Sequence, residues 1–223
     1  MPTFLKNGQT ILFIGDSITE CDRRMPVYSP LGWGYVRMFA DIMIIREPEK
    51  QIRIINKGIN ENTIAHLLSR WCDDVVEYQP DVLFVLIGIN DATRYLDRSP
   101  SLHCSPEKYK TIYRRLVEET QKRVPHCKIL LMQPFFTSRG DDIEGSYRNE
   151  LISSLTAYIK AVEETAGDFG LSLIPLSAEF QRLLRYKNPD VFSEDKIHPN
   201  LTGHLVIAEA VYHGLQQKDS SYV

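Results

Sequence analysis

Short, mostly apolar runs recur along the chain and are rich in branched residues. Their lengths of four to six residues are typical of β-strands rather than helices. The runs cover residues 11–14, 52–55, 82–87, 129–132 and 171–174. Because they leave few polar side chains for solvent, we expect strands that are buried on both faces of a sheet.

Between these runs, apolar residues return at the three- and four-residue spacing of an amphipathic helix, over residues 64–78 and 151–162. A last helix is predicted to begin at Pro199, because proline suits the first helical position. Its expected buried stripe consists of Leu201, Leu205, Ala208, Val211 and Leu215.

The alternation of buried strands and helices predicts an α/β fold. Parallel strands need long crossovers, which helices supply on both faces. We therefore expect a three-layer α/β/α sandwich around a five-stranded parallel sheet, in a single domain over residues 1–223. Long polar connections follow three of the strands, at residues 18–30, 90–106 and 134–146, where such sheets form their ligand crevice.

The charge of the chain is nearly balanced, with a formal net value of −3. So weak a field favours a small-molecule partner over nucleic acid or an anionic membrane. Neither a signal-peptide pattern nor an apolar segment of membrane-spanning length is visible, so a cytoplasmic location is expected. The cysteines form no Cys-x-x-Cys pair and are expected to be free thiols: Cys21, Cys72, Cys104 and Cys127.

Ser17 directly follows the first predicted strand and a Gly-Asp turn. A serine hydroxyl is a weak nucleophile, so catalysis needs a base in hydrogen-bond reach and a third group that orients the base. His198 is the favoured base, because Asp195 precedes it by three residues and can orient its ring. Asp190 and Glu194 remain alternative acids nearby.

Ester hydrolysis also needs hydrogen-bond donors for the negative charge that develops on the carbonyl oxygen. The candidates are the backbone N–H of Gly58, the side-chain amide of Asn90 and the backbone N–H of Ser17. All three follow a predicted strand, so we expect them at one edge of the sheet.

Four sequence blocks in this order resemble the SGNH (GDSL-type) esterase and lipase superfamily. They are Gly15-Asp16-Ser17, Gly58, Gly88-x-Asn90-Asp91 and Asp195-x-x-His198-Pro199. With Gly32-Trp33-Gly34-Tyr35, the chain also looks like the bacterial branch that contains xylan-oligosaccharide acetylesterases. One departure is Ile18, a conservative change at the position where the motif has leucine.

The resemblance implies a flavodoxin-like strand order, Ser17 as nucleophile, His198 as general base and acid, and Asp195 as its orienting carboxylate. It also implies an oxyanion hole made of the Ser17 N–H, the Gly58 N–H and the Asn90 side chain. The expected activity is hydrolysis of short acyl esters, with acetyl groups on carbohydrates favoured and no metal or organic cofactor. Homo-oligomerisation is left open.

Several alternatives accompany this hypothesis. The same residues would serve a thioesterase or a lysophospholipase, and a non-catalytic binder of small molecules is a further reading. A magnesium site at Asp16 and Asp91 would leave Ser17, Asn90 and His198 unexplained.

Arg23 and Arg24 are expected to be a solvated surface pair. About half of the aromatic residues near the crevice are expected to pack in the core: Trp33, Tyr35, Tyr95, Phe135, Phe136 and Phe192.

Overall fold

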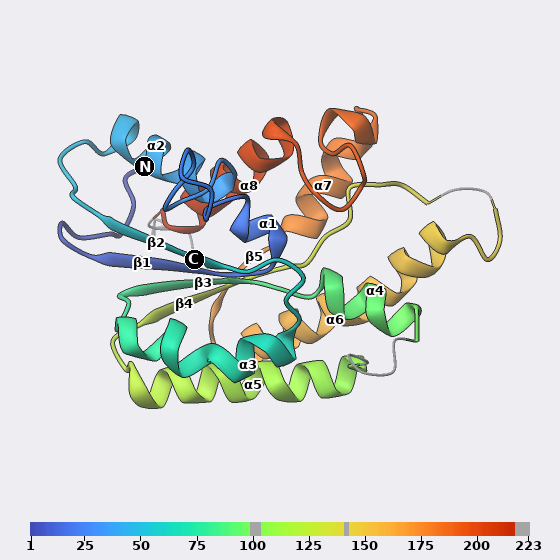
Figure 1. Ribbon diagram of the computed structural model, residues 1–223, viewed down its shortest axis with the longest axis horizontal. Coiled ribbons are helices and arrows are strands. Elements are labelled where there is room, and N and C mark those ends of the chain that lie inside the picture. The colour runs from blue at the N-terminus through green and yellow to red at the C-terminus, as the bar shows by residue number, and fades with distance from the viewer. Residues whose placement is uncertain (99–103, 141–142, 217–223) are drawn as a thin grey trace, which may run out of the picture.

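The computed structural model describes residues 1–98, 104–140 and 143–216. Within them lies a five-stranded sheet of order β2-β1-β3-β4-β5, in which every neighbouring pair is parallel (Figure 1). The strands are β1 (Thr10–Gly15), β2 (Arg53–Gly58), β3 (Val82–Leu86), β4 (Lys128–Met132) and β5 (Ser172–Ile174). This order is the flavodoxin-like one, so the predicted sheet is confirmed.

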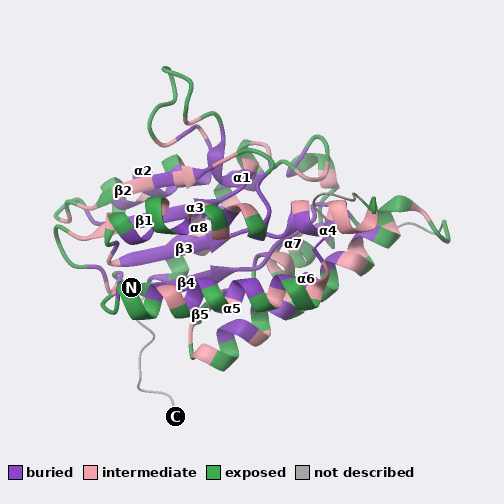
Figure 2. Cartoon of the chain, turned by 60° about the horizontal axis from the view of Figure 1, so that its bottom comes forward, coloured by how far each residue is buried: buried purple, intermediate pink, exposed green. Residues whose placement is uncertain are grey.

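The centre of the sheet is its most apolar part. Every residue of β3 is buried, as is β1 from its second residue onward (Figure 2). Phe13 of β1 and Phe84 of β3 are register partners, and their rings stack with centroids 4.7 Å apart. The uninterrupted apolar runs in the sequence therefore reflect burial on both faces.

Helices cover both faces of the sheet, which confirms the three-layer architecture (Figure 1). One face carries α1 (Ser17–Glu20), α2 (Tyr35–Arg46), α7 (Leu176–Leu184) and α8 (Leu201–Gly214). The other carries α3 (Ile64–Asp74), α4 (Ile89–Leu96), α5 (Pro106–Arg123) and α6 (Tyr147–Phe169). Two short 3₁₀ helices, η1 (Val76–Tyr78) and η2 (Pro189–Val191), complete the set. None of the described helices has the length and apolar character needed to cross a membrane.

The predicted start of the last helix is wrong. Helix α8 begins at Leu201, and Asn200 is its N-cap, whose side chain accepts the Gly203 N–H at 3.2 Å. Asparagine caps a helix by such a bond, and this local signal outweighs the preference of Pro199 for a first turn. Pro199 instead pairs with Ser193 in an isolated antiparallel bridge.

The buried face of α8 also differs in part from the predicted stripe. Leu201 and Leu205 are 63% and 47% exposed, whereas Ala208, Val211 and Leu215 are buried as expected. The core face is completed by residues that the sequence pattern left out, among them Gly203, His204 and Ile207.

Two other expectations need adjustment. The helical stretch 64–78 is interrupted after Asp74, where α3 ends and η1 follows. The polar connections after β1 and β3 are partly helical, since α1 and α4 occupy their first residues. Residues 99–103 and 141–142 of the predicted crevice loops lie outside the described residues.

Candidate active site

Ser17 stands at the carboxyl edge of the sheet, two residues after β1. Asp16 is the N-cap of α1, and its carboxylate accepts the Ile18 N–H at 3.0 Å. A Cβ at Gly15 would lie less than 3.0 Å from the Leu86 carbonyl oxygen, so the turn that presents Ser17 requires glycine.

The histidine segment is held in place by backbone contacts. The Ser193 hydroxyl donates to the His198 carbonyl at 2.8 Å. Thr137 donates its N–H and its hydroxyl to the Lys196 carbonyl, at 2.9 and 2.7 Å. His198 is thereby fixed opposite Ser17, although 181 residues separate them in sequence.

Ser17, His198 and Asp195 form one hydrogen-bonded chain. Ser17 Oγ lies 3.0 Å from His198 Nε2, and His198 Nδ1 lies 2.6 Å from Asp195 Oδ2. The other carboxylate oxygen of Asp195 accepts the N–H groups of Ile197 and His198, at 2.9 and 2.7 Å. An ionised carboxylate only accepts, so Nδ1 carries the proton and Nε2 is free to accept from Ser17.

The electrostatics favour an ionised Asp195. Burial raises the pKa of Asp195, but the bonds from the His198 N–H and imidazole and from the Ile197 N–H outweigh burial and leave the pKa below its usual value. Asp190, an alternative acid, is paired with Lys196 instead. Glu194, the other alternative acid, lies in the wall of a pocket beside His198. In the described part of the chain, it makes no hydrogen bond to the imidazole.

Ser17 opens into a pocket of about 430 Å³, and a trough of about 630 Å³ adjoins it. Trp33, His198 and Pro199 line both, so the two form one groove past the nucleophile. Trp33 is oriented by a 2.9 Å bond from its indole N–H to Asp22. The pocket wall mixes apolar and polar side chains, and the polar ones include Glu20, Asp22, Asn60, Glu61 and Asn90.

Two of the three predicted oxyanion donors reach this pocket. The Ser17 N–H is the first of α1 and has no acceptor within the helix. The Asn90 amide donates one N–H to the Asn62 carbonyl at 3.1 Å, which orients the amide and leaves its second N–H for a ligand.

Gly58 is not brought to the nucleophile. Its N–H donates to the Asn56 side chain at 2.8 Å, and the residue does not line the pocket. A Cβ at this position would collide with the backbone of Thr19 and Glu20. Gly58 therefore allows α1 to lie against β2, and the sequence-based assignment of a donor role is corrected.

Glu61 was missed in the sequence and lies in the pocket wall. Its φ of 62° is in the left-handed region, where glycine is usual, and its N–H has no acceptor among the described residues. A glutamate gives no sequence signal for such a conformation, because glycine is the residue that usually adopts it.

Two buried carboxyls flank the site, at Asp16 and Asp91. Asp91 accepts the Ile64 N–H with both oxygens at 3.1 Å, at the start of α3. Burial raises the pKa of both carboxyls to about 7. Because each carboxyl binds a helix N-terminus, this arrangement accounts for both residues without the magnesium site considered from the sequence.

His204 is a further buried histidine near the pocket, but its environment prevents a catalytic charge. Its Nδ1 accepts the Tyr35 N–H at 3.2 Å, and its Nε2 lies 3.4 Å from Cys21 Sγ. Burial lowers the pKa of His204 to about 3 and raises that of Cys21 to about 12. The pair is thus a neutral packing contact rather than a thiolate nucleophile with its base.

The other residues noted in the sequence divide between core and surface. Arg24 is exposed, but Arg23 is half-buried and donates to the Gly58 carbonyl at 2.8 Å, so the expected surface pair is only half right. Trp33 and Tyr95 are partly exposed. The remaining crevice aromatics are buried: Tyr35, Phe135, Phe136 and Phe192.

A serine, a histidine and an aspartate bonded in this order, at the carboxyl edge of a doubly wound sheet, define a serine hydrolase. The chain belongs to the GDSL-like Lipase/Acylhydrolase family, whose profile matches residues 13–206. It is a carboxylic ester hydrolase, which confirms the family and the enzyme class expected from the sequence.

Similar proteins have been characterised. An acetylxylan esterase from Geobacillus stearothermophilus is 34% identical over 210 residues, which cover 92% of each chain. The crystal structure of Axe2, an acetylxylan esterase from that organism, matches with a TM-score of 0.84 at 32% identity, over 95% of this chain and 96% of that one. Catalytic mutants of Axe2 replace a serine, a histidine or an aspartate by alanine. LAE5, an alpha/beta hydrolase enzyme from the metagenome of Lake Arreo in Spain, matches with a TM-score of 0.85 at 30% identity, over 96% and 97%.

The raised pKa of Asp91 predicts a pH-dependent stability cost. Between the usual pKa near 3.8 and about 7, the folded state binds more protons than the unfolded state, so stability falls as pH rises. Asp91→Asn removes this slope while keeping an acceptor for Ile64. Relative to the native chain, the variant should gain on the order of 2 kcal/mol across this window. Urea unfolding at a series of pH values measures the gain.

Glu47→Gln is a control, because the pKa of Glu47 is shifted in the opposite direction from that of Asp91. Burial raises the pKa of Glu47, but bonds from Lys50 and Thr3 outweigh burial and lower the pKa overall. Loss of this carboxylate should therefore cost stability above its usual pKa and cost little in acid. Parallel pH profiles for the native chain and Asp91→Asn would contradict the assignment of Asp91.

Proposed function

We propose that this ester hydrolase removes acetyl groups from carbohydrates, with Ser17 as nucleophile, His198 as general base and acid, and Asp195 as the orienting carboxylate. The hydrogen-bonded chain that joins the three side chains carries the proposal. The similar acetylxylan esterase supports the acetylated substrate. An open groove with Trp33 and several charged and amide side chains in its wall suits a sugar, because an aromatic face and hydroxyl-binding groups lie together there.

In the acylation step, Ser17 Oγ bonds to the ester carbonyl carbon while its proton passes to His198 Nε2. The carbonyl π electrons move onto the oxygen, which becomes a tetrahedral oxyanion. Asp195 stabilises the imidazolium by its bond to Nδ1 and stays ionised. When the oxyanion collapses, the bond to the sugar oxygen breaks, and Nε2 returns the proton to that oxygen.

In the deacylation step, water takes the place of the sugar alcohol. Its oxygen attacks the acetyl-enzyme carbonyl while one of its protons passes to His198 Nε2. Collapse of the second oxyanion releases acetic acid and returns the proton to Ser17 Oγ. Ser17, His198 and the attacking water thus account for every proton of the cycle.

The oxyanion hole in this proposal consists of the Ser17 N–H, the Asn90 amide and the Glu61 N–H in place of Gly58. Glu61 shares the pocket wall with Ser17, Asn90 and His198. Its neighbour Asn62 accepts the Asn90 amide, so the two donors belong to adjoining segments. Preorganised donors of this kind stabilise the transition state without reorganisation.

A thioesterase or lysophospholipase is the less favoured assignment. A long acyl chain needs an apolar channel, whereas several charged and amide side chains surround Ser17. A short acetyl group and a hydroxylated leaving group fit this lining better. The non-catalytic binder is set aside, because the chain belongs to a hydrolase family.

A cytoplasmic location is part of the proposal. All four cysteines are unpaired thiols, which suits a reducing compartment.

A substrate series tests the proposed activity. Acetylated xylo-oligosaccharides and p-nitrophenyl acetate should be hydrolysed efficiently, with kcat/KM falling at least about tenfold from acetate to octanoate because a long acyl chain would lie against charged and amide side chains in the pocket wall. Released acetate and p-nitrophenol give the rates. Ser17→Ala should hydrolyse none of the substrates while keeping its circular dichroism spectrum. An optimum at octanoate, or activity retained in Ser17→Ala, would contradict the proposal.

A second series tests the Glu61 donor. Glu61→Gly and Glu61→Ala keep the N–H and should retain kcat within about threefold, since the side chain is not the donor. Glu61→Pro removes the N–H and cannot adopt a φ of 62°, so kcat should fall by about 10²–10³. Steady-state kinetics on p-nitrophenyl acetate measure both effects. Native kcat in the proline variant would exclude Glu61 as a donor.

A further inference from the structure

We propose that Arg70 is the positioning residue of the oxyanion hole, because its guanidinium ties together the backbone segments that supply the donors. The inference rests on the proposed active site above. Arg70 belongs to α3 and is not among the described residues that line the groove. Its effect on the reaction would therefore be exerted through other residues.

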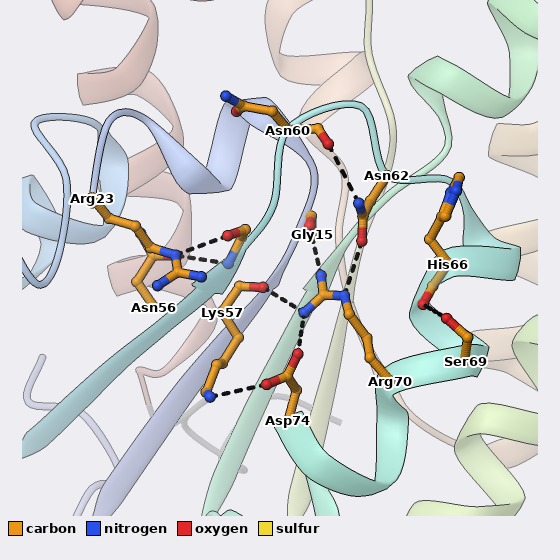
Figure 3. Close-up of polar contacts among 11 residues, drawn as sticks. Gly15, Arg23, Asn56, Lys57, Asn60, Asn62, His66, Ser69, Arg70 and Asp74 are labelled. Atoms are coloured by element: carbon orange, nitrogen blue, oxygen red, sulfur yellow. Dashed lines mark hydrogen bonds and ion pairs between the residues drawn. The ribbon is translucent and has the colours of Figure 1, made fainter. Parts of the chain in front are cut away.

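Arg70 reaches from α3 to the ends of two strands and to the loop after the second strand (Figure 3). Its side chain is only 14% exposed. Nη2 donates to the Gly15 carbonyl at 3.1 Å, and Nη1 donates to the Lys57 carbonyl at 2.9 Å. Nε donates to the Asn62 side chain at 2.9 Å. One side chain thus joins three separate backbone segments.

Two of the three segments are next to a proposed oxyanion donor. Gly15 lies two residues before Ser17. Asn62 directly follows Glu61, and its carbonyl accepts the Asn90 amide at 3.1 Å. Ser17 and Glu61 are thus within two residues in sequence of a group that Arg70 binds. Asn90 is joined to such a group by one hydrogen bond.

The loop that contains Glu61 has few other ties to the sheet. The Ile59 N–H donates to the Gly15 carbonyl at 3.2 Å, and the Asn62 N–H closes a turn on the Ile59 carbonyl at 3.3 Å. The Asn62 side chain also donates to the Asn60 carbonyl at 3.3 Å. Arg94 of α4 pairs with the Glu61 carboxylate at 3.5 Å, but it does not connect the turn to the strands. Arg70 connects the turn to both strand ends, so its removal should loosen the left-handed Glu61.

The chemistry of the position calls for arginine. The guanidinium offers five N–H donors in a planar fork, which matches acceptors in several directions, whereas lysine is a point charge with three donors. Asp74 balances the charge, accepting from Arg70 Nη1 at 2.6 Å and from Lys57 Nζ at 2.9 Å. Burial lowers the pKa of Arg70, and Asp74 opposes that shift.

A purely structural role would make a different prediction. A buried ion pair that only holds the fold together lowers the melting temperature when it is broken, but leaves kcat unchanged wherever the variant is folded. A positioning role lowers kcat at such temperatures with little change in KM, because the oxyanion exists only after attack. Misplacement of a catalytic group by about 1 Å can lower the rate by up to about 10²-fold.

The experiment compares Arg70→Lys, Arg70→Ala and the native chain on p-nitrophenyl acetate, at a temperature where circular dichroism shows all of them folded. We expect kcat to fall about 10–100-fold in both variants, with KM within about threefold. Binding of methylboronic acid, which forms a tetrahedral adduct on the serine, should weaken by a similar factor. Guanidinium ion should restore part of the activity of Arg70→Ala and none in Arg70→Lys, whose side chain fills the site.

Thr120→Val is the matched control on the opposite side of α3. Its hydroxyl accepts the Trp71 indole N–H at 3.0 Å, so its loss disturbs the packing of α3 on α5 and lowers stability. Its kcat should equal that of the native chain. Native kcat in Arg70→Lys and Arg70→Ala, or an equal loss of kcat in Thr120→Val, would overturn the inference.

The Ser17→Ala variant distinguishes failure of the Arg70 role from failure of the proposed active site. If Ser17→Ala is inactive while both Arg70 variants keep native kcat and boronate affinity, the active site stands and the role of Arg70 fails. If Ser17→Ala remains active, the proposed site itself fails, and the Arg70 inference falls with it.

Discussion

The close approach of three backbone segments at the carboxyl edge of the sheet is the constraint on which the site depends. The turn after β1 lies against the end of β3 at Gly15, and α1 lies against β2 at Gly58. Neither position has room for a Cβ. Because these contacts fix the direction in which α1 leaves the sheet, they also fix Ser17 opposite His198, a residue from the far end of the chain.

Such close contact leaves charged groups buried around the nucleophile, and three of them are held by hydrogen bonds to the backbone. Asp16 and Asp91 bind helix N-termini, and Arg70 binds two strand-end carbonyls. Burying charged groups costs stability unless they are hydrogen-bonded, and these hydrogen bonds offset part of the desolvation penalty. They also hold the carboxyl edge of the sheet rigid, as the stabilisation of a short-lived oxyanion requires.

The sequence predicted those features that short-range patterns encode. Apolar runs located the strands, and three-residue spacing identified Asp195 as the partner of His198. The N-cap of α8 was missed because Pro199 and Asn200 are both plausible starting signals, and the bond from the Gly203 N–H to the Asn200 side chain decides between them. Gly58 was assigned as an oxyanion donor because a glycine lets another group approach its backbone closely. The sequence does not show whether that group is the substrate or, as in the structure, helix α1. Glu61 and Arg70 depend on tertiary contacts and leave no local pattern.

The central claim is that Ser17, Glu61 and Asn90 surround the oxyanion while His198 handles the proton. A crystal structure of the covalent adduct with p-nitrophenyl methylphosphonate tests it most directly, since the phosphonyl oxygen marks the oxyanion position. We predict phosphorus bonded to Ser17 Oγ, with that oxygen about 3 Å from the Ser17 N, Glu61 N and Asn90 Nδ2 atoms. A phosphonyl oxygen bound to the Gly58 N–H, or no adduct on Ser17, would contradict the account.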